Sequence, residues 1–344
     1  MENAIASPAP TSSRTPFVVT GLLVLALSLG GLFYYKWLGS WHKVSGIQTA
    51  GAWTAPADGL TSGGVLKGSV YYFGKVWIAL LFGIVIGAAV RALVSRRWIG
   101  RLLAEGGTAR RQLAGGLAGA PLMLCSCCVT PVFTGLYERG ARLGAALSVM
   151  LGSPGLNPAA LLLTFILFPL DMSLARLAAS LAAVFILPAV LERLFKEAKI
   201  APAKLAGPEE EAPRTFAEFL VRFAKSLGYL TLITVPMIAA GVVLSALVLP
   251  AAASMTHAGA FVALVSIAAI AVVIALPTFF EIPLALAFLQ AGLPGPAAAM
   301  LVAGPIVNLP SLFVLGRETN WKVASALAAG VWILAIGAGV AVIR

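Results

Sequence analysis

The chain has 344 residues, of which 60% are hydrophobic and only 11% are charged. Soluble domains carry roughly 25% charged residues, so a chain this poor in charge could not cover its surface in water. This excludes a soluble enzyme, a disordered protein and a disulfide-rich secreted domain, and the mean hydropathy of +0.97 agrees. The net charge of +11 would suggest nucleic acid for a soluble protein. Here the cations lie between apolar runs, as in membrane proteins, so we expect the lipid bilayer and no nucleic acid as partner.

The amino-terminal region is predicted to be a polar tail followed by a membrane helix. Residues 1–16 are polar and predicted to be disordered. The apolar run that follows ends in tyrosine and tryptophan side chains, which is typical of a membrane interface. Because no small-residue cleavage site is present, we interpret residues 17–69 as a retained extra transmembrane helix with an external loop.

The apolar runs of the chain are of two kinds. A spanning helix needs about 20 apolar residues, and the uninterrupted candidates are Phe17–Tyr35, Val70–Val94, Ser173–Leu194, Leu227–Leu249 and Val323–Ile343. Proline interrupts four others, which are Leu113–Tyr137, Leu143–Phe168, Phe261–Leu289 and Pro296–Leu315. Broken backbone at membrane depth persists only where it is buried in protein or lines a cavity, so these breaks point to a transport site. The prolines expected to break helices are Pro121, Pro131, Pro154, Pro158, Pro277, Pro283, Pro305 and Pro310.

Two parts of the chain repeat each other. The motif Pro-Gly-Leu-Asn at residues 154–157 corresponds to Pro-Ile-Val-Asn at residues 305–308, and the spacing of these two motifs defines the repeat interval. Upstream, the paired positions are further apart by one residue, and they are Pro131 with Pro283, Gly140 with Gly292, and Ala145-Ala146 with Ala297-Ala298. The order of these matches predicts an internal duplication with one residue inserted near Ser153.

The basic residues predict how the two copies are oriented. Most of the 24 Lys and Arg residues lie in segments that we assign to the cytoplasm, which are Arg91–Arg111, Glu138–Arg142, Glu192–Lys225 and Arg317–Lys322. The external side then keeps Lys36, Lys43, Lys67, Lys75, Arg176 and Arg344. With this assignment Leu113–Tyr137 is a re-entrant hairpin from the cytoplasm and Phe261–Leu289 is a hairpin from outside. The copies are then inverted, as in many secondary transporters. If Phe261–Leu276 crossed fully instead, the copies would be parallel and the carboxy terminus cytoplasmic.

We therefore predict an all-α, polytopic membrane protein with two inverted repeats, each with a re-entrant or broken-helix hairpin. The first repeat covers residues 70–194 and the second covers residues 226–344. A charged cytoplasmic linker at residues 195–225 joins them. The linker is too short for a nucleotide-binding domain, and the chain has no phosphate-binding loop motif, so any transport is secondary or depends on a partner chain.

The cysteines Cys125, Cys127 and Cys128 lie within four residues, between two prolines of the first interrupted hairpin. A disulfide framework needs spaced cysteines, whereas clustered thiolates suit Cu(I), Zn or a thiophilic element such as trivalent arsenic or antimony. A helix start at the break would favour the thiolate form. Ser126 and Thr130 can add hydroxyl groups at the same tip. The alternative is that the cysteines are only small buried hydrophobic residues.

Glu281 is the acid that lies deep in an apolar segment, close to the repeat equivalent of the cysteine cluster. A carboxylate at that depth is costly and usually faces a cavity or a partner. We therefore expect it to carry a coupling proton or to contact the substrate, with capping of a half-helix as the alternative. Asn157 and Asn308 follow the two breaks, where each side chain could satisfy freed backbone groups or face the substrate.

Two stretches resemble a known family. The run Ala120–Leu162, which contains Cys-Ser-Cys-Cys-Val-Thr-Pro and Ser-Pro-Gly-Leu-Asn-Pro, is similar to the signature of the YraQ-like predicted permeases. The second-half run Ala-Gly-Pro-Ile-Val-Asn-Leu-Pro resembles the second repeat of that family. The group includes ArsP-type permeases, which export trivalent organoarsenicals with a membrane cysteine pair. Carried over, that pair would be Cys125 and Cys127, while Cys128 stands where the family pattern has glycine. A Thr-Phe-Phe-Glu run also stands where some relatives carry another cysteine motif.

These features favour a multi-pass permease of the bacterial inner (plasma) membrane that moves a small thiophilic species outward, driven by protons. We expect no enzyme activity and no cofactor, and we expect a soft metal or metalloid to bind the three cysteines as substrate. Two other functions stay open. One is a membrane thiol oxidoreductase, although a disulfide relay normally needs two separated cysteine pairs. The other is a channel or the membrane subunit of a larger transporter. A homo-oligomer is compatible with each of these functions.

Overall fold

The computed structural model describes residues 15–50, 64–93, 103, 105–198, 216–254, 259–276 and 279–343. Within these ranges all regular secondary structure is helical, which satisfies backbone hydrogen bonds inside a bilayer. Three helical stretches of the described part are long and apolar enough to cross a membrane, or five if each of two bent helix pairs is one span. Large apolar side chains are also exposed on the outside, among them Leu27 at 73% and Leu232 at 77%. The chain is therefore a helical membrane protein, as its sequence predicts.

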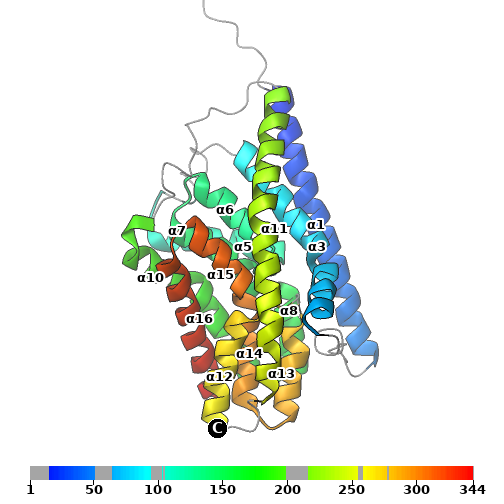
Figure 1. Cartoon of the computed structure of the whole chain (residues 1–344), viewed down its shortest axis with the longest axis vertical. Coiled ribbons are helices and arrows are strands. Elements are labelled where there is room, and N and C mark those ends of the chain that lie inside the picture. Colours follow the sequence, from blue (N-terminus) through cyan, green and yellow to red (C-terminus); the bar gives the residue numbers. More distant parts are fainter. Residues whose placement is uncertain are drawn as a thin grey trace, which may run out of the picture.

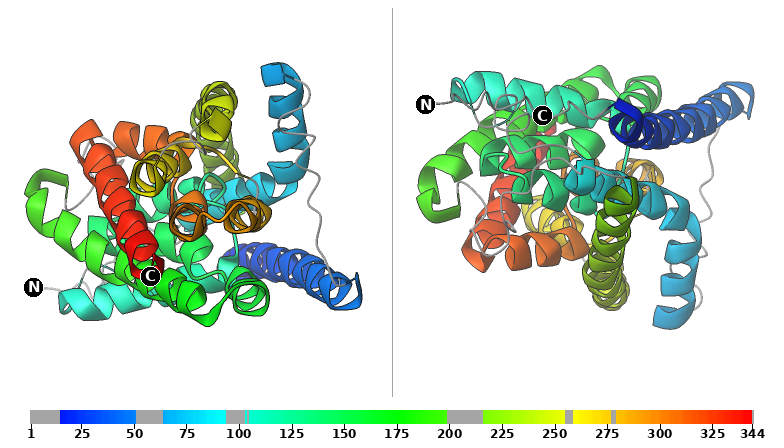
Figure 2. Two further views of the ribbon diagram at one scale, coloured as in Figure 1. Left: turned by 90° about the horizontal axis from the view of Figure 1, so that it is seen from below. Right: turned by 90° about the horizontal axis from the view of Figure 1, so that it is seen from above.

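Three long helices stand on one side of the molecule (Figure 1), and they are α1 (Thr15–Ala50), α3 (Gly64–Leu93) and α11 (Phe216–Ser254). Both views of Figure 2 show α1 and α3 at the edge of the bundle. The predicted tail at residues 1–16 lies almost entirely outside the described residues. α1 and α3 therefore flank the rest of the bundle and leave its centre to shorter helices.

The beginning of α11 differs from the predicted linker at residues 195–225. Phe216, Phe219 and Phe223 recur at helical spacing, and their rings pack against each other with centroids 6.2 and 5.9 Å apart. This aromatic ladder extends the helix, so α11 begins at Phe216. Residues 199–215 lie outside the described part of the chain.

Short helices form the rest of the molecule. Those of the first half are α5 (Thr108–Gly119), η2 (Ala120–Leu122), α6 (Thr130–Glu138), α7 (Leu143–Gly155), α8 (Pro158–Leu167), α9 (Leu170–Leu181), η3 (Ala182–Ile186), α10 (Leu187–Leu194) and η4 (Lys196–Ala198). Those of the second half are α12 (Ala260–Val273), α13 (Glu281–Gln290), α14 (Pro294–Ile306), α15 (Leu309–Glu318) and α16 (Trp321–Val342). The buried apolar side chains of both halves form one continuous core.

The helices of the two halves recur at a constant interval. α7 spans residues 143–155 and α14 spans residues 294–306, so their first and last residues are both separated by the repeat interval of the proline motifs. The same interval separates α8 from α15, and the two helix pairs bend by similar angles, 42° and 43°. It also separates the first residues of α6 and α13. The duplication read from the sequence thus has a counterpart in the order of helices.

The register change between the copies lies earlier than predicted. Gly140 and Gly292 are further apart than the repeat interval by one residue, and both adopt the left-handed conformation, with φ of 96° and 76°. They mark the same turn, since α7 and α14 begin shortly after it and are already separated by the repeat interval itself. The extra residue is therefore in the turn after the glycine and not near Ser153, and Ala145-Ala146 is one position out of register with Ala297-Ala298.

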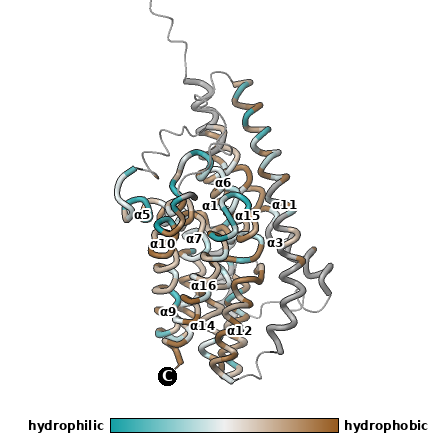
Figure 3. The backbone as a smooth tube through the Cα atoms, turned by 60° about the vertical axis from the view of Figure 1, so that its left-hand side comes forward, coloured by the Kyte–Doolittle hydropathy of each residue, from teal (hydrophilic) through white to brown (hydrophobic). Residues whose placement is uncertain are grey.

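Corresponding elements occupy opposite ends of the molecule. In Figure 1, α6 and α10 lie in the upper part, whereas α12, α13 and the carboxy-terminal end of α16 lie in the lower part. Figure 3 shows the hydrophilic stretches gathered around α5, α6, α10 and α15, at the end away from the carboxy terminus. The chain returns to this polar end in both halves.

The prolines divide into two groups by position. Pro121, Pro131, Pro158 and Pro310 lie in the first two positions of their helices, where the missing N–H is not needed. Pro283 is the third residue of α13. Pro154 and Pro305 instead lie inside α7 and α14, each one residue before the helix ends, so they do not sit in the break itself. Pro277 lies outside the described residues.

Candidate functional site

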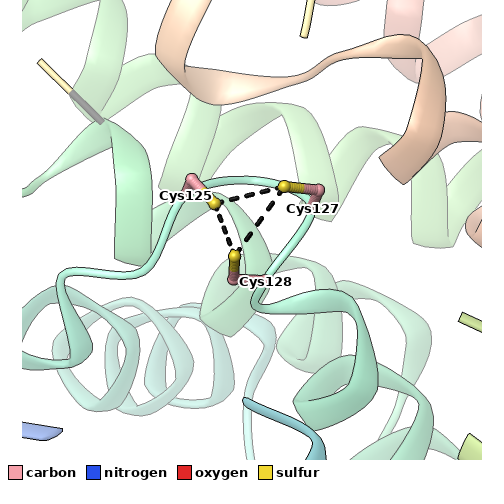
Figure 4. A group of neighbouring side chains, drawn as sticks. All are labelled: Cys125, Cys127 and Cys128. Carbon is pink, nitrogen blue, oxygen red and sulfur yellow. Dashed lines mark hydrogen bonds between the residues drawn. The ribbon is translucent and has the colours of Figure 1, made fainter. Parts of the chain in front are cut away.

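The three cysteines lie together in the break between η2 and α6. Their thiols are free, and the side chains are between 0% and 5% exposed. The Sγ atoms point toward one another (Figure 4), at 3.2 Å for Cys125–Cys127, 2.7 Å for Cys125–Cys128 and 3.8 Å for Cys127–Cys128. The predicted position at the tip of a broken hairpin agrees with this geometry.

Short hydrogen-bonded contacts fix the loop that carries the thiols. The amide of Leu124 donates to the Ser153 hydroxyl of α7 at 2.9 Å, and that hydroxyl reaches back to the Leu124 carbonyl at 3.3 Å. The hydroxyl of Thr130 donates to the carbonyl of Cys127 at 2.6 Å. Thr130 and Ser126 are buried, and the bond of Thr130 goes to backbone. Ser153 is a positioning residue that the sequence did not reveal.

Two glycines bring α3 against the same loop. A Cβ atom on Gly83 would lie 2.1 Å from the carbonyl oxygen of Cys128, and one on Gly87 would lie 2.4 Å from that of Pro131. Since real side chains do not approach backbone this closely, only glycine permits this packing. α3 therefore presses on the cysteine loop from the side opposite Ser153.

Glu281 is the first residue of α13 and is 2% exposed. Its Oε1 atom accepts a hydrogen bond from Nη2 of Arg176 on α9 at 3.3 Å, and both side chains are almost fully buried. Arg176 Nη1 also donates to the hydroxyl of Thr164 on α8. The carboxylate is thus half of a buried ion pair between the two halves and makes no side-chain cap on its own helix.

Arg176 corrects the charge assignment made from the sequence, which placed it among external basic residues. The residue lies within a membrane span, at 1% exposure. Counting every arginine as a loop residue hid it, whereas its place inside the apolar run that begins near Ser173 was the available signal. An arginine there needs a partner, and Glu281 supplies it.

A small cavity connects the two breaks. It is lined by Leu124, Cys125, Pro154, Asn157, Ala160, Leu276, Glu281 and Pro305. Cys125 with Leu276, and Pro154 with Pro305, are pairs separated by the repeat interval, so the cavity lies where the two copies meet. Water centres can occupy about 10 Å³ of it, which is room for about one water molecule.

The two asparagines cap the second helix of each bent pair. Asn157 accepts from the amides of Ala159 and Ala160 at 3.1 and 3.2 Å, while it also lines the cavity. Asn308 accepts from the amide of Ser311 at 3.0 Å in a reciprocal capping arrangement. Of the residues predicted to contact substrate, Cys125 and Asn157 line this cavity together with Glu281. The others lie buried around it.

The comparisons with known proteins agree with the resemblance read from the motifs. UPF0718 protein YraQ of Escherichia coli (strain K12) is 30% identical over 307 residues, which is 86% of this chain and 86% of the relative. UPF0718 protein MJ0584 of Methanocaldococcus jannaschii is 22% identical over 122 residues, 35% of this chain and 33% of the relative. No solved structure matches the chain.

The family model named ArsP_1, described as a predicted permease, matches residues 63–343. The match covers α3 to α16 and leaves α1 outside it. It therefore includes the cysteine loop, Arg176 and Glu281, all of which line or adjoin the cavity. Because the match covers most of the chain and both repeats, this chain belongs to the ArsP_1 family of predicted permeases.

Proposed function

We propose that the chain is a secondary, proton-coupled permease of the bacterial inner membrane that exports a small thiophilic species. The observation that carries this proposal is the shared cavity, in which a thiol of the cysteine cluster and the Glu281 carboxylate line one buried space. Soft sulfur ligands select soft metals and trivalent metalloids. A membrane carboxylate is the usual carrier of a coupling proton.

We further propose that the two halves are inverted repeats. The segment of α9 and α10 ends at the polar end of the molecule, while its repeat equivalent α16 ends at the opposite, carboxy-terminal end (Figure 1). Inverted repeats place substrate and coupling groups at their interface near the bilayer midplane. The cavity between the two breaks has the position that this arrangement predicts.

The polar end is proposed to face the cytoplasm. Residues 139–142 and 317–322 are basic connections at the ends of α6 and α15, and they lie at the end where hydrophilic residues gather (Figure 3). Basic loops are retained in the cytoplasm during insertion. The carboxy terminus is then external, and the cysteine hairpin opens from inside.

The ion pair supplies a coupling step for this function. In the resting state Arg176 holds Glu281 ionised, because separating the two charges in a buried site is costly. A proton entering from the acidic external side neutralises Glu281 and weakens the bond that joins α9 to α13. Release of this proton to the cytoplasm restores the pair, so one turn of the cycle can drive the substrate the other way.

Reconstitution of the purified chain tests the proposal directly. Proteoliposomes that contain only this chain should accumulate arsenite or antimonite against its gradient when their interior is more acidic than the medium. Empty liposomes and the Cys125→Ser variant should not, because a hard oxygen replaces a soft sulfur ligand. Equal uptake with and without the pH gradient would contradict proton coupling. The absence of uptake under all gradients would instead favour a subunit that needs a partner chain.

A further inference from the structure

The third thiol defines the number of bonds that the site offers. We infer that it takes a trivalent centre with three exchangeable hydroxyl groups, arsenous or antimonous acid, bound by Cys125, Cys127 and Cys128 together. This inference rests on the proposed function and narrows its substrate class. A compound with one carbon substituent on the trivalent centre has only two exchangeable bonds and would leave one of the three thiols unused.

The distances allow one centre to reach all three sulfurs. A thiolate lies roughly 2.3 Å from a small bound ion, so two ligands of one ion lie at most about 4.6 Å apart. The three Sγ–Sγ distances are 2.7, 3.2 and 3.8 Å. The sulfurs therefore already form a triangle of the right size (Figure 4), without a change in the course of the loop.

The charge of the product favours a trivalent centre over a soft metal cation. Three thiolates leave two negative charges on Cu(I) and one on Zn(II), and burying an uncompensated charge is costly. The thiols are buried, and the cation that acts on Cys125 from outside the cluster is the half-buried Lys36 of α1. Zn(II) also takes four ligands in structural sites, whereas the ligating group here has three.

Binding of a trivalent hydroxide creates no charge at any stage. Each thiol gives its proton to one hydroxyl group, one sulfur bond forms as one oxygen bond breaks, and one water leaves. Three thiols and one arsenous acid molecule thus yield a neutral trithiolate and three waters, with no change in oxidation state. A buried site can therefore accept and release this substrate without moving an ion through the apolar core.

The size of the neighbouring space leads to the same substrate class. The cavity beside Cys125 holds about one water molecule, and its wall includes the apolar side chains of Leu124 and Leu276. A hydroxyl group or a departing water fits that space, whereas an aryl substituent does not. Shape and ligand number thus both favour the inorganic trihydroxides.

X-ray absorption on the reduced, full-length chain in lipid nanodiscs tests the ligand number. Sodium arsenite should show three sulfur neighbours in the wild-type chain. Cys128→Ser should show two sulfurs and one oxygen, with affinity lowered by about tenfold or more. Phenylarsine oxide, which has two exchangeable bonds, should show two sulfurs and bind more weakly than arsenite. Melting curves of both chains establish that Cys128→Ser is folded.

The outcomes separate this inference from the proposed function. Arsenite bound through only two sulfurs in the wild-type chain, or tighter binding of phenylarsine oxide than of arsenite, overturns the three-thiol site and leaves a thiophilic permease standing. A chain that is folded and reduced but binds neither compound overturns the inference and the proposed function together. Three sulfurs that fall to two in Cys128→Ser support the inference.

Discussion

Arg176 changes what a substitution at Glu281 means. Replacing the carboxylate removes a titratable group, but it also leaves a buried guanidinium whose Nε atom already has no partner among the described residues. Breaking one side of a buried pair typically costs about 3–5 kcal/mol, whereas replacing both charges can be nearly neutral. A loss of transport in a single variant would therefore mix coupling with stability.

The paired substitution separates these effects. We expect Glu281→Gln and Arg176→Gln each to lower the melting temperature, and the double variant to recover most of the loss. Gradient-driven uptake should stay absent in Glu281→Gln and in the double variant, because glutamine cannot titrate. Thermal unfolding and pH-dependent uptake into everted vesicles measure the two effects. The double variant Arg111→Gln/Glu192→Gln, a buried 3.0 Å pair outside the cavity, should keep its pH dependence. A normal pH profile in Glu281→Gln would remove the residue from the mechanism.

Ser153 holds the cysteine loop through its hydroxyl group. Ser153→Ala removes the acceptor of the Leu124 amide, and an unsatisfied buried amide costs about 1–3 kcal/mol. We expect faster alkylation of the buried thiols, since the loop opens more often. The rate of thiol modification by a membrane-permeant maleimide reports this. Thr231→Ala, which removes an exposed hydroxyl on α11, should leave the rate unchanged. Equal rates in all three proteins would show that Ser153 does not position the loop.

Among the elements, α3 and the cysteine loop depend on each other most directly. Gly83→Ala would place a methyl group 2.1 Å from the Cys128 carbonyl, so α3 or the loop must shift. Overpacking of this kind costs about 1–3 kcal/mol, and we expect weaker arsenite binding as the triangle of sulfurs is distorted. Gly74→Ala on the same helix meets nothing within 4 Å and serves as the control. Unchanged binding in Gly83→Ala would show that the loop tolerates movement of α3.

The breaks could be predicted at the scale of elements, but not their fine structure. Proline and glycine interrupt apolar runs, so both broken hairpins and both bent helix pairs could be located from the sequence. The roles of single prolines could not, because Pro154 ends a helix while Pro158, four residues later, begins the next. Periodicity also missed the start of α11, where aromatic packing extends the helix beyond its apolar run.

At the scale of the whole molecule, the sequence predicted the helical membrane class and the family from composition and motifs. The cysteine site was found because its ligands are neighbours in sequence. The ion pair was not, since Arg176 and Glu281 are 105 residues apart and meet only through the packing of the halves. Charge counting treats arginine as a topology signal, and so it misassigned the one that is buried.

The orientation of the halves has a direct test. If they are inverted, the loop at residues 317–322 is cytoplasmic and the carboxy terminus is external. A phosphatase reporter, which is active only in the periplasm, should be active when fused after Arg344. A reporter that fluoresces only in the cytoplasm should be dark at that position. The opposite pair of results would indicate parallel repeats and contradict the proposed topology.

The constant interval between the halves shows how far the two copies have diverged. At this interval, Cys125 corresponds to Leu276, and Thr130 corresponds to Glu281 at the first position of its helix. An ancestor that worked as a pair of identical chains would have carried sulfur and carboxylate twice, once on each side of its symmetry axis. Fusion into one polypeptide let mutation act on each copy alone, so that one copy kept the ligands and the other the acid. The result is the layout of a dimer around a single, lopsided binding position.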